Sequence, residues 1–65
     1  MNVNVGDVTI LEDVNIALAA QVAANICGVE VGPVAVLGTA VDASGTTATV
    51  CGPRRGRAPV TITQN

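Results

Sequence analysis

The chain has 65 residues, a formal charge of −2, and no histidine, lysine or aromatic residue. A chain this short forms one domain at most and buries only about 60% of its unfolded surface, so we expect a disulfide or a second copy to stabilise it. The composition disfavours nucleic acid binding, which needs a broad basic surface, and catalysis, which usually needs a base beside a nucleophile. We therefore expect a protein that is not an enzyme, uses no cofactor and binds no nucleic acid.

The first informative stretch alternates between apolar and polar residues. Between Asp7 and Gly28 the even positions are apolar except for Glu12, and the odd positions are mostly small or polar. This alternation is typical of a strand with one buried face, so we predict an extended backbone from Asp7 to Ile26 with a bend near residues 11–13. The stretch is either two strands joined at the acidic pair or one unusually long strand. Its apolar face would be a self-association surface formed by Ile10, Val14, Ile16, Leu18, Val22 and Ile26.

A helix over residues 14–27 is the alternative for the same stretch. Alanine is abundant there, Asp13 could cap the helix and Gly28 could end it. On a helical wheel, however, Leu18 and Val22 share an arc with polar residues, so no clean apolar stripe results. We therefore prefer the strand. The segment is also too short for a transmembrane span, which needs about 20 apolar residues.

The rest of the chain shows short β-type runs separated by turn residues. We predict strands within 29–31, 34–41, 46–51 and 59–63, a turn at Gly32-Pro33 and a hairpin loop at 42–45. The expected organisation is a β-rich core (1–52), a linker rich in Arg, Gly and Pro (53–58) and a C-terminal strand or tail (59–65). The expected fold is all-β, a small disulfide-linked sheet protein that assembles into filaments or sheet-stacked oligomers.

The C-terminal segment is our candidate for an inter-subunit contact. A strand on a loose linker can pair within its own subunit or add to the sheet of a neighbour. We expect Val60 and Ile62 to make the contact with the neighbouring subunit.

A short sequence form recurs along the chain. Val-(Asn/Thr)-(Val/Ile) occurs at residues 3–5, 8–10, 14–16 and 60–62. Two copies lie six residues apart, as in hexapeptide β-helices. We interpret the recurrence as the consequence of a composition rich in β-forming residues.

The chain has two cysteines, Cys27 and Cys51. Without histidine they cannot complete an ordinary zinc site, which takes four ligands. A disulfide, within one chain or between two, would contribute about 3 kcal/mol and indicates an oxidising compartment. The alternative is a pair of buried thiols. We expect a secreted or cell-surface protein whose leader has been removed, although a cytoplasmic location stays open.

The charged residues suggest no binding site. The carboxylates could gather a calcium ion, but we expect them to solvate loop tips instead, and we expect no metal site. They are Asp7, Glu12, Asp13, Glu30 and Asp42. The three arginines, at positions 54, 55 and 57, are expected to lie in a solvated linker.

One part of the sequence resembles a known family. The run Ala24-Asn25-Ile26-Cys27-Gly28, followed by Val29, Val31 and a second cysteine after a Gly- and Thr-rich stretch, resembles the chaplins. Residues 13–17, Asp-Val-Asn-Ile-Ala, resemble the rodlins. Both are secreted surface proteins of filamentous actinobacteria, and the likeness covers about residues 14–51. It implies β-sheet fibrils that make a surface water-repellent, and an intramolecular disulfide between the two cysteines.

Three functions remain in view. The first is a self-assembling structural surface protein that forms β-rich fibres or a hydrophobic coat, with itself and cell-wall or other surface proteins as partners. The second is a small β-domain that binds another protein through an edge strand or its C-terminal tail. The third is a membrane-active peptide with a helical segment at 14–27.

Overall fold

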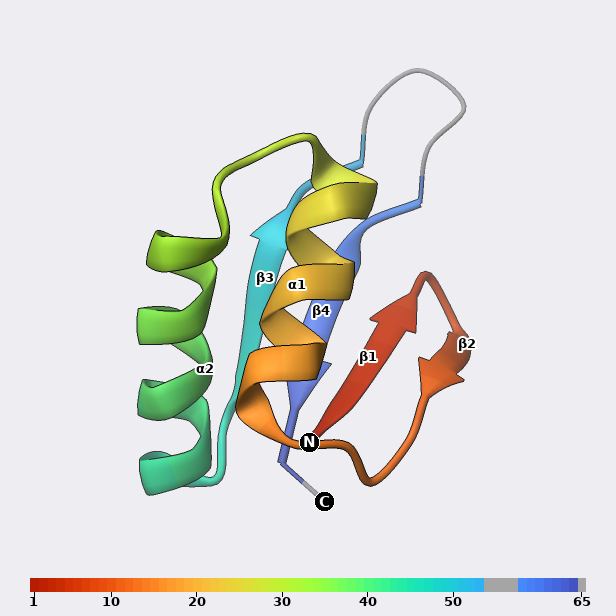
Figure 1. Ribbon diagram of the computed structural model, residues 1–65. Helices are drawn as coiled ribbons and strands as arrows, with labels where there is room; N and C mark the ends of the chain where they lie inside the picture. Colours follow the sequence, from red (N-terminus) through yellow and green to blue (C-terminus); the bar gives the residue numbers. More distant parts are fainter. Residues whose placement is uncertain (54–57, 65) are drawn as a thin grey trace.

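The computed structural model, which describes residues 1–53 and 58–64, has two layers: a four-stranded antiparallel sheet and two helices on one of its faces (Figure 1). The elements are β1 (Asn2–Val5), β2 (Val8–Leu11), α1 (Ile16–Cys27), α2 (Val31–Ser44), β3 (Thr47–Cys51) and β4 (Val60–Thr63). The predicted all-β fold is therefore wrong, because the middle of the chain is helical.

The strand order in the sheet is β2-β1-β4-β3, and all neighbouring strands are antiparallel. The strands β2, β3 and β4 lie within stretches for which alternation and β-branched residues favoured strands, so these predictions are confirmed. The first and last strands, β1 and β4, pair in the centre of the sheet. The C-terminal strand is therefore an integral part of its own domain. Most of the predicted linker, residues 54–57, lies outside the described residues.

The segment predicted to be extended as far as Ile26 contains the helix α1, so that prediction is wrong beyond β2. The side chain of Asn15 caps the helix by accepting a hydrogen bond from the Leu18 amide at 2.8 Å. At the other end, Gly28 adopts a left-handed conformation (φ 69°) and donates its amide to the Ala24 carbonyl. The alternative helix thus had the correct end, but its cap is Asn15 rather than Asp13.

The buried side of α1 consists of alanines. Ala19, Ala20, Ala23 and Ala24 are at most 1% exposed, whereas Leu18 is 43% exposed. Small side chains allow a helix to approach its neighbours closely, and alanine has the highest helix propensity. The wheel showed no clean stripe because we looked for large apolar residues, while the residues that pack against the sheet and α2 are the smallest ones.

The second helix, α2, occupies the region where we predicted strands at 29–31 and 34–41 and a hairpin loop at 42–45. These predictions are wrong. Pro33 lies in the first turn, where its missing N–H is not needed. Gly38 was taken as an interruption, but it lets α2 approach the N-terminal region: a β-carbon there would lie only 3.0 Å from Cγ2 of Ile16. The predicted loop is the last turn of the helix, which Gly45 caps.

Both edge strands carry an irregularity in their pairing. In β2 the register shifts so that Ile10 is the extra residue, and in β3 the extra residue is Val50. A bulge twists an edge strand and hinders pairing with another chain. The pairing of the two central strands is therefore regular, whereas the pairing of each edge strand is interrupted.

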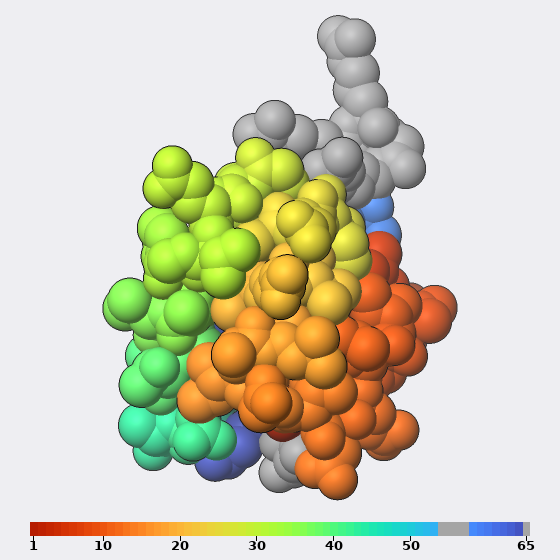
Figure 2. Space-filling view, in the orientation of Figure 1, coloured from red at the N-terminus to blue at the C-terminus, as the bar shows by residue number. Residues whose placement is uncertain are grey.

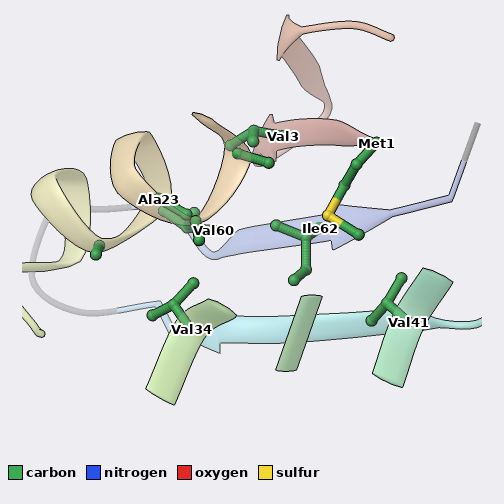
Figure 3. Packing of buried hydrophobic residues seen from close by; sticks show 10 residues of the cluster. Met1, Val3, Ala23, Val34, Val41, Val60 and Ile62 are labelled. Carbon is green, nitrogen blue, oxygen red and sulfur yellow. The ribbon is translucent and has the colours of Figure 1, made fainter. Parts of the chain in front are cut away.

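The core lies between the sheet and the helices (Figure 3). Val3, Val60 and Ile62 come from the two central strands, and Val34 and Val41 come from α2; each is at most 4% exposed. Met1 is also buried, and its terminal ammonium donates a hydrogen bond to the Val14 carbonyl at 2.7 Å. The largest fully buried side chain is an isoleucine, so the core is made of small residues and offers limited burial energy.

Candidate functional site

The six residues predicted as one self-association face do not share a face. Ile10 lies on β2, Val14 lies in the connection before α1, and the other four lie on α1. Leu18, Val22 and Ile26 are spaced by four residues, so the helix places them along one flank, from exposed Leu18 to half-buried Val22 and Ile26. The dry face proposed between stacked sheets is therefore absent, because it required an extended backbone through residue 26.

The residues predicted to contact another subunit are buried in their own. Val60 and Ile62 are fully inaccessible to solvent and lie between β1 and β3, beneath the helices (Figure 3). In this position neither side chain can reach a second copy. This placement replaces the inter-subunit contact that we expected from the C-terminal segment.

The two cysteines form a disulfide within the chain. Cys27 at the end of α1 and Cys51 at the end of β3 are bonded, with 5.9 Å between their Cα atoms. The predicted disulfide is confirmed, and the two alternatives of buried free thiols and of an inter-chain bond do not apply. The bond ties the helical layer to an edge of the sheet.

The helices present an uncharged surface to solvent, which we call the helical face. α1 contains no ionisable residue, and the only charged residues of α2 and its N-cap are Glu30 and Asp42. Four large apolar side chains are exposed here, with Val36 the most exposed at 72%. Figure 2 shows the molecule from the side on which the two helices lie. The helical face comprises Ala17, Leu18, Gln21, Asn25, Val29, Val31, Val36, Thr39 and Ala40. Surface helices normally carry charged residues on this side.

The opposite face of the sheet is also uncharged but polar. Alternate residues of the strands point away from the helices, and on this side they are all threonine or asparagine. We call this surface the threonine face: Asn2, Asn4, Thr9, Thr47, Thr49, Thr61 and Thr63. No described element covers it (Figure 1). Sequence analysis missed it, although Thr47-Ala48-Thr49 and Thr61-Ile62-Thr63 alternate clearly, because only the pairing of β3 with β4 aligns these residues.

The acidic residues lie at the ends of elements rather than on either face. Asp7 is in the β1–β2 turn, Glu12 and Asp13 follow β2, and all five carboxylate residues are exposed. Within residues 1–53 and 58–64, no three or more cysteine or acidic residues come close enough to hold a metal ion. Across the same residues, neither helix has the length and apolar character needed to cross a membrane.

The chain's only serine does not form a catalytic arrangement with the described residues near it. Ser44 Oγ donates to the Ala40 carbonyl at 2.8 Å and lies 2.8 Å from Thr46 Oγ1. Neither partner can act as a general base. The hydroxyl therefore serves the end of α2 and the turn into β3.

Comparison with known proteins provides no relative on which to base a function. No protein family, no curated protein and no solved structure matches this chain. Its function therefore has to be inferred from its own residues and fold.

Proposed function

We propose that the protein is a non-catalytic structural protein that associates with copies of itself through the helical face and forms a coat on a surface. The observation that carries this proposal is the exposure of Leu18, Val31 and Val36 on helices that are almost free of charge, together with that of Val29 in the connection between them. The cross-sheet fibre expected from an extended segment is not part of the proposal, because that segment is helical.

Association through the helical face would cost little desolvation. The central part of a protein interface is depleted of charged residues, and α1 has none to bury. The polar residues of this face, such as Gln21 and Asn25, are neutral and can pair with their counterparts in a second copy. Because the largest fully buried side chain of the core is an isoleucine, the additional apolar burial would also stabilise a domain of marginal size.

The two faces together favour a coat over a closed globular assembly. One side of the domain is apolar, the opposite side carries hydroxyl and amide groups, and the exposed carboxylates lie around the ends of the elements. A protein with this arrangement orients itself at a boundary between water and an apolar phase, as amphipathic elements do. The disulfide supports secretion into an oxidising compartment. The resemblance to chaplins and rodlins supports a secreted surface protein, but the β-sheet fibrils that it implies are not part of this proposal.

The test compares two valine-to-lysine variants by sedimentation velocity over a range of concentrations. Val36→Lys puts a charge on the helical face, and Val8→Lys puts the same charge on β2, where Val8 is 63% exposed. We expect the wild type and Val8→Lys to form oligomers at high concentration, and we expect Val36→Lys to remain monomeric. Circular dichroism of both variants checks that each is folded.

Other outcomes would contradict the proposal. A wild type that stays monomeric at every concentration removes self-association. Dissociation by Val8→Lys but not by Val36→Lys would place self-association on the edge strand β2 instead of the helical face, because Val8 and Ile10 are exposed on that edge. A membrane-active helix has less support, since α1 buries its alanine side in the domain.

A further inference from the structure

We propose that the threonine face binds ice. This inference does not depend on self-association, because it concerns the face of the sheet opposite the helices. It rests on three properties of the face: its regular spacing, its fixed side chains and its lack of charge.

The first property is the spacing set by the strand register. The pairing aligns the side chains in two rows that run across the strands. One row contains Thr9, Asn4, Thr61 and Thr49, and the other contains Asn2, Thr63 and Thr47. Neighbouring strands are about 4.8 Å apart and alternate residues of a strand are about 6.8 Å apart. The hydroxyl and amide groups therefore form a small grid with two constant repeats.

The second property is that four of the seven side chains are joined by hydrogen bonds before any ligand arrives. Thr9 Oγ1 donates to Asn4 Oδ1 at 2.7 Å. The Asn4 amide in turn donates to Thr61 Oγ1 at 3.4 Å and to Thr63 Oγ1 at 3.5 Å. Threonine is stiff at χ1 because it is β-branched, so little rotamer freedom is lost when such a surface binds.

The third property is the chemistry of the grid. It contains no charged residue and no aromatic residue. Nucleic acid partners need cations, protein partners are usually held by aromatic or arginine anchors, and the large apolar contacts that aromatic rings provide are missing here. A neutral crystalline partner needs neither cations nor aromatic anchors and therefore suits this surface better.

Ice is a neutral lattice in which every water molecule both donates and accepts hydrogen bonds at fixed positions. A threonine hydroxyl also donates and accepts, and its methyl group limits competing hydration by liquid water. A grid of fixed threonines can thus hold water molecules in lattice positions, whereas a charged side chain would order water around itself. Hydrogen-bonded water molecules are about 2.8 Å apart, so the grid repeats of about 4.8 and 6.8 Å correspond to water molecules that are separated by at least one other molecule of the lattice.

The experiment measures incorporation of the protein into a slowly growing ice hemisphere, relative to an unrelated globular protein of similar size. Thr49→Lys places a charge in the first row, at a position that is exposed on the edge strand β3. The matched control is Ala43→Lys, which places the same charge at an exposed position of α2 outside both faces. We expect the wild type and Ala43→Lys to be enriched in ice, and Thr49→Lys to fall to the level of the unrelated protein.

Further variants keep the test decisive. Thr47→Lys places the charge in the second row and replaces Thr49→Lys if that variant does not fold, as judged by circular dichroism. Val36→Lys should abolish self-association yet retain enrichment in ice, so the two proposals can fail separately. Exclusion of the wild type from ice, or equal enrichment of Thr49→Lys and Ala43→Lys, would overturn the inference. Binding to cellulose powder without enrichment in ice would overturn it in favour of a polysaccharide partner.

Discussion

The tripeptide Val-Thr-Ile occurs twice in the chain, at residues 8–10 and 60–62, and the two copies have opposite environments. In β2, Val8 is 63% exposed and Ile10 is 42% exposed, whereas Val60 and Ile62 in β4 are fully buried. Both copies lie in strands, although β2 has a bulge at Ile10. The difference comes from the strand order: β2 is at the edge, while β4 lies between β1 and β3 beneath the helices.

An identical short sequence can therefore be central to stability in one strand and dispensable in another. Alternation predicts a strand but does not say which strand becomes central. The bulge at Ile10 strengthens the contrast, since it displaces that side chain from the regular pairing of β2 with β1.

The first prediction, for which we expect the greatest loss of stability, compares Ile62 in β4 with Ile10 in β2. Ile62→Ala removes a buried side chain and leaves a cavity, so we expect it to lower the free energy of unfolding by about 2–5 kcal/mol. Ile10→Ala removes an exposed side chain and should cost about 0.5 kcal/mol. Urea denaturation followed by circular dichroism measures both.

If Ile62→Ala is too unstable to measure, Ile62→Val serves instead, with an expected loss of about 0.5–1.5 kcal/mol against almost none for Ile10→Val. Equal losses at the two positions would show that β2 and β4 are not as different as their burial indicates.

The second prediction concerns the disulfide, which joins β3, the neighbour of β4, to α1. No disulfide joins the other edge strand, β2, to the rest of the domain. The double variant Cys27→Ala, Cys51→Ala should lose about 3 kcal/mol of stability, because the unfolded chain is no longer cross-linked. Urea denaturation measures this loss. A reducing agent should shift the wild type to a similar midpoint and leave the double variant unchanged. If the double variant unfolded at the same urea concentration as the oxidised wild type, the stabilising role of the bond would be refuted.

The third prediction, for which we expect the smallest loss of stability, concerns a related form of the tripeptide. Val-Asn-Ile at residues 14–16 starts a helix instead of forming a strand. Asn15→Ala removes the side chain that caps α1 and should cost about 1 kcal/mol. Asn15→Asp should retain the cap, because a carboxylate oxygen also accepts from the Leu18 amide. Thermal unfolding monitored by circular dichroism measures both variants.

The control for the cap is Asn25→Ala, since Asn25 is exposed in the interior of the same helix. Alanine has the higher helix propensity, so this variant should be as stable as the wild type or slightly more stable. A loss at Asn25 as large as the loss at Asn15 would argue against capping as the cause.

Part of the fold could be predicted from local sequence. The strands β2, β3 and β4 follow from alternation and β-branched residues, and the disulfide follows from two cysteines in a chain without histidine. The helices could not be predicted with the same arguments. Alternation continues through residues 14–26, but five of these thirteen residues are alanines, which suit a helix as well as a strand.

The surfaces show the same division. The lack of charge between residues 14 and 29 is visible in the sequence, but its placement on a solvent-exposed helical face is not. The threonine face also needs the register, because Thr49 and Thr61 become neighbours only when β3 pairs with β4.

The sequence alone therefore determined what depends on near neighbours: the β-forming runs, the glycine that ends α1 and the small, uncharged composition. Tertiary structure decided what depends on distant partners. Ala19, Ala20, Ala23 and Ala24 became a packing surface because the sheet and α2 approach them, and Gly38 was needed because Ile16 and Met1 lie against it. The physical reason is that burial is a property of the assembled layers: a small side chain supports close packing only where another element is near enough to use the space.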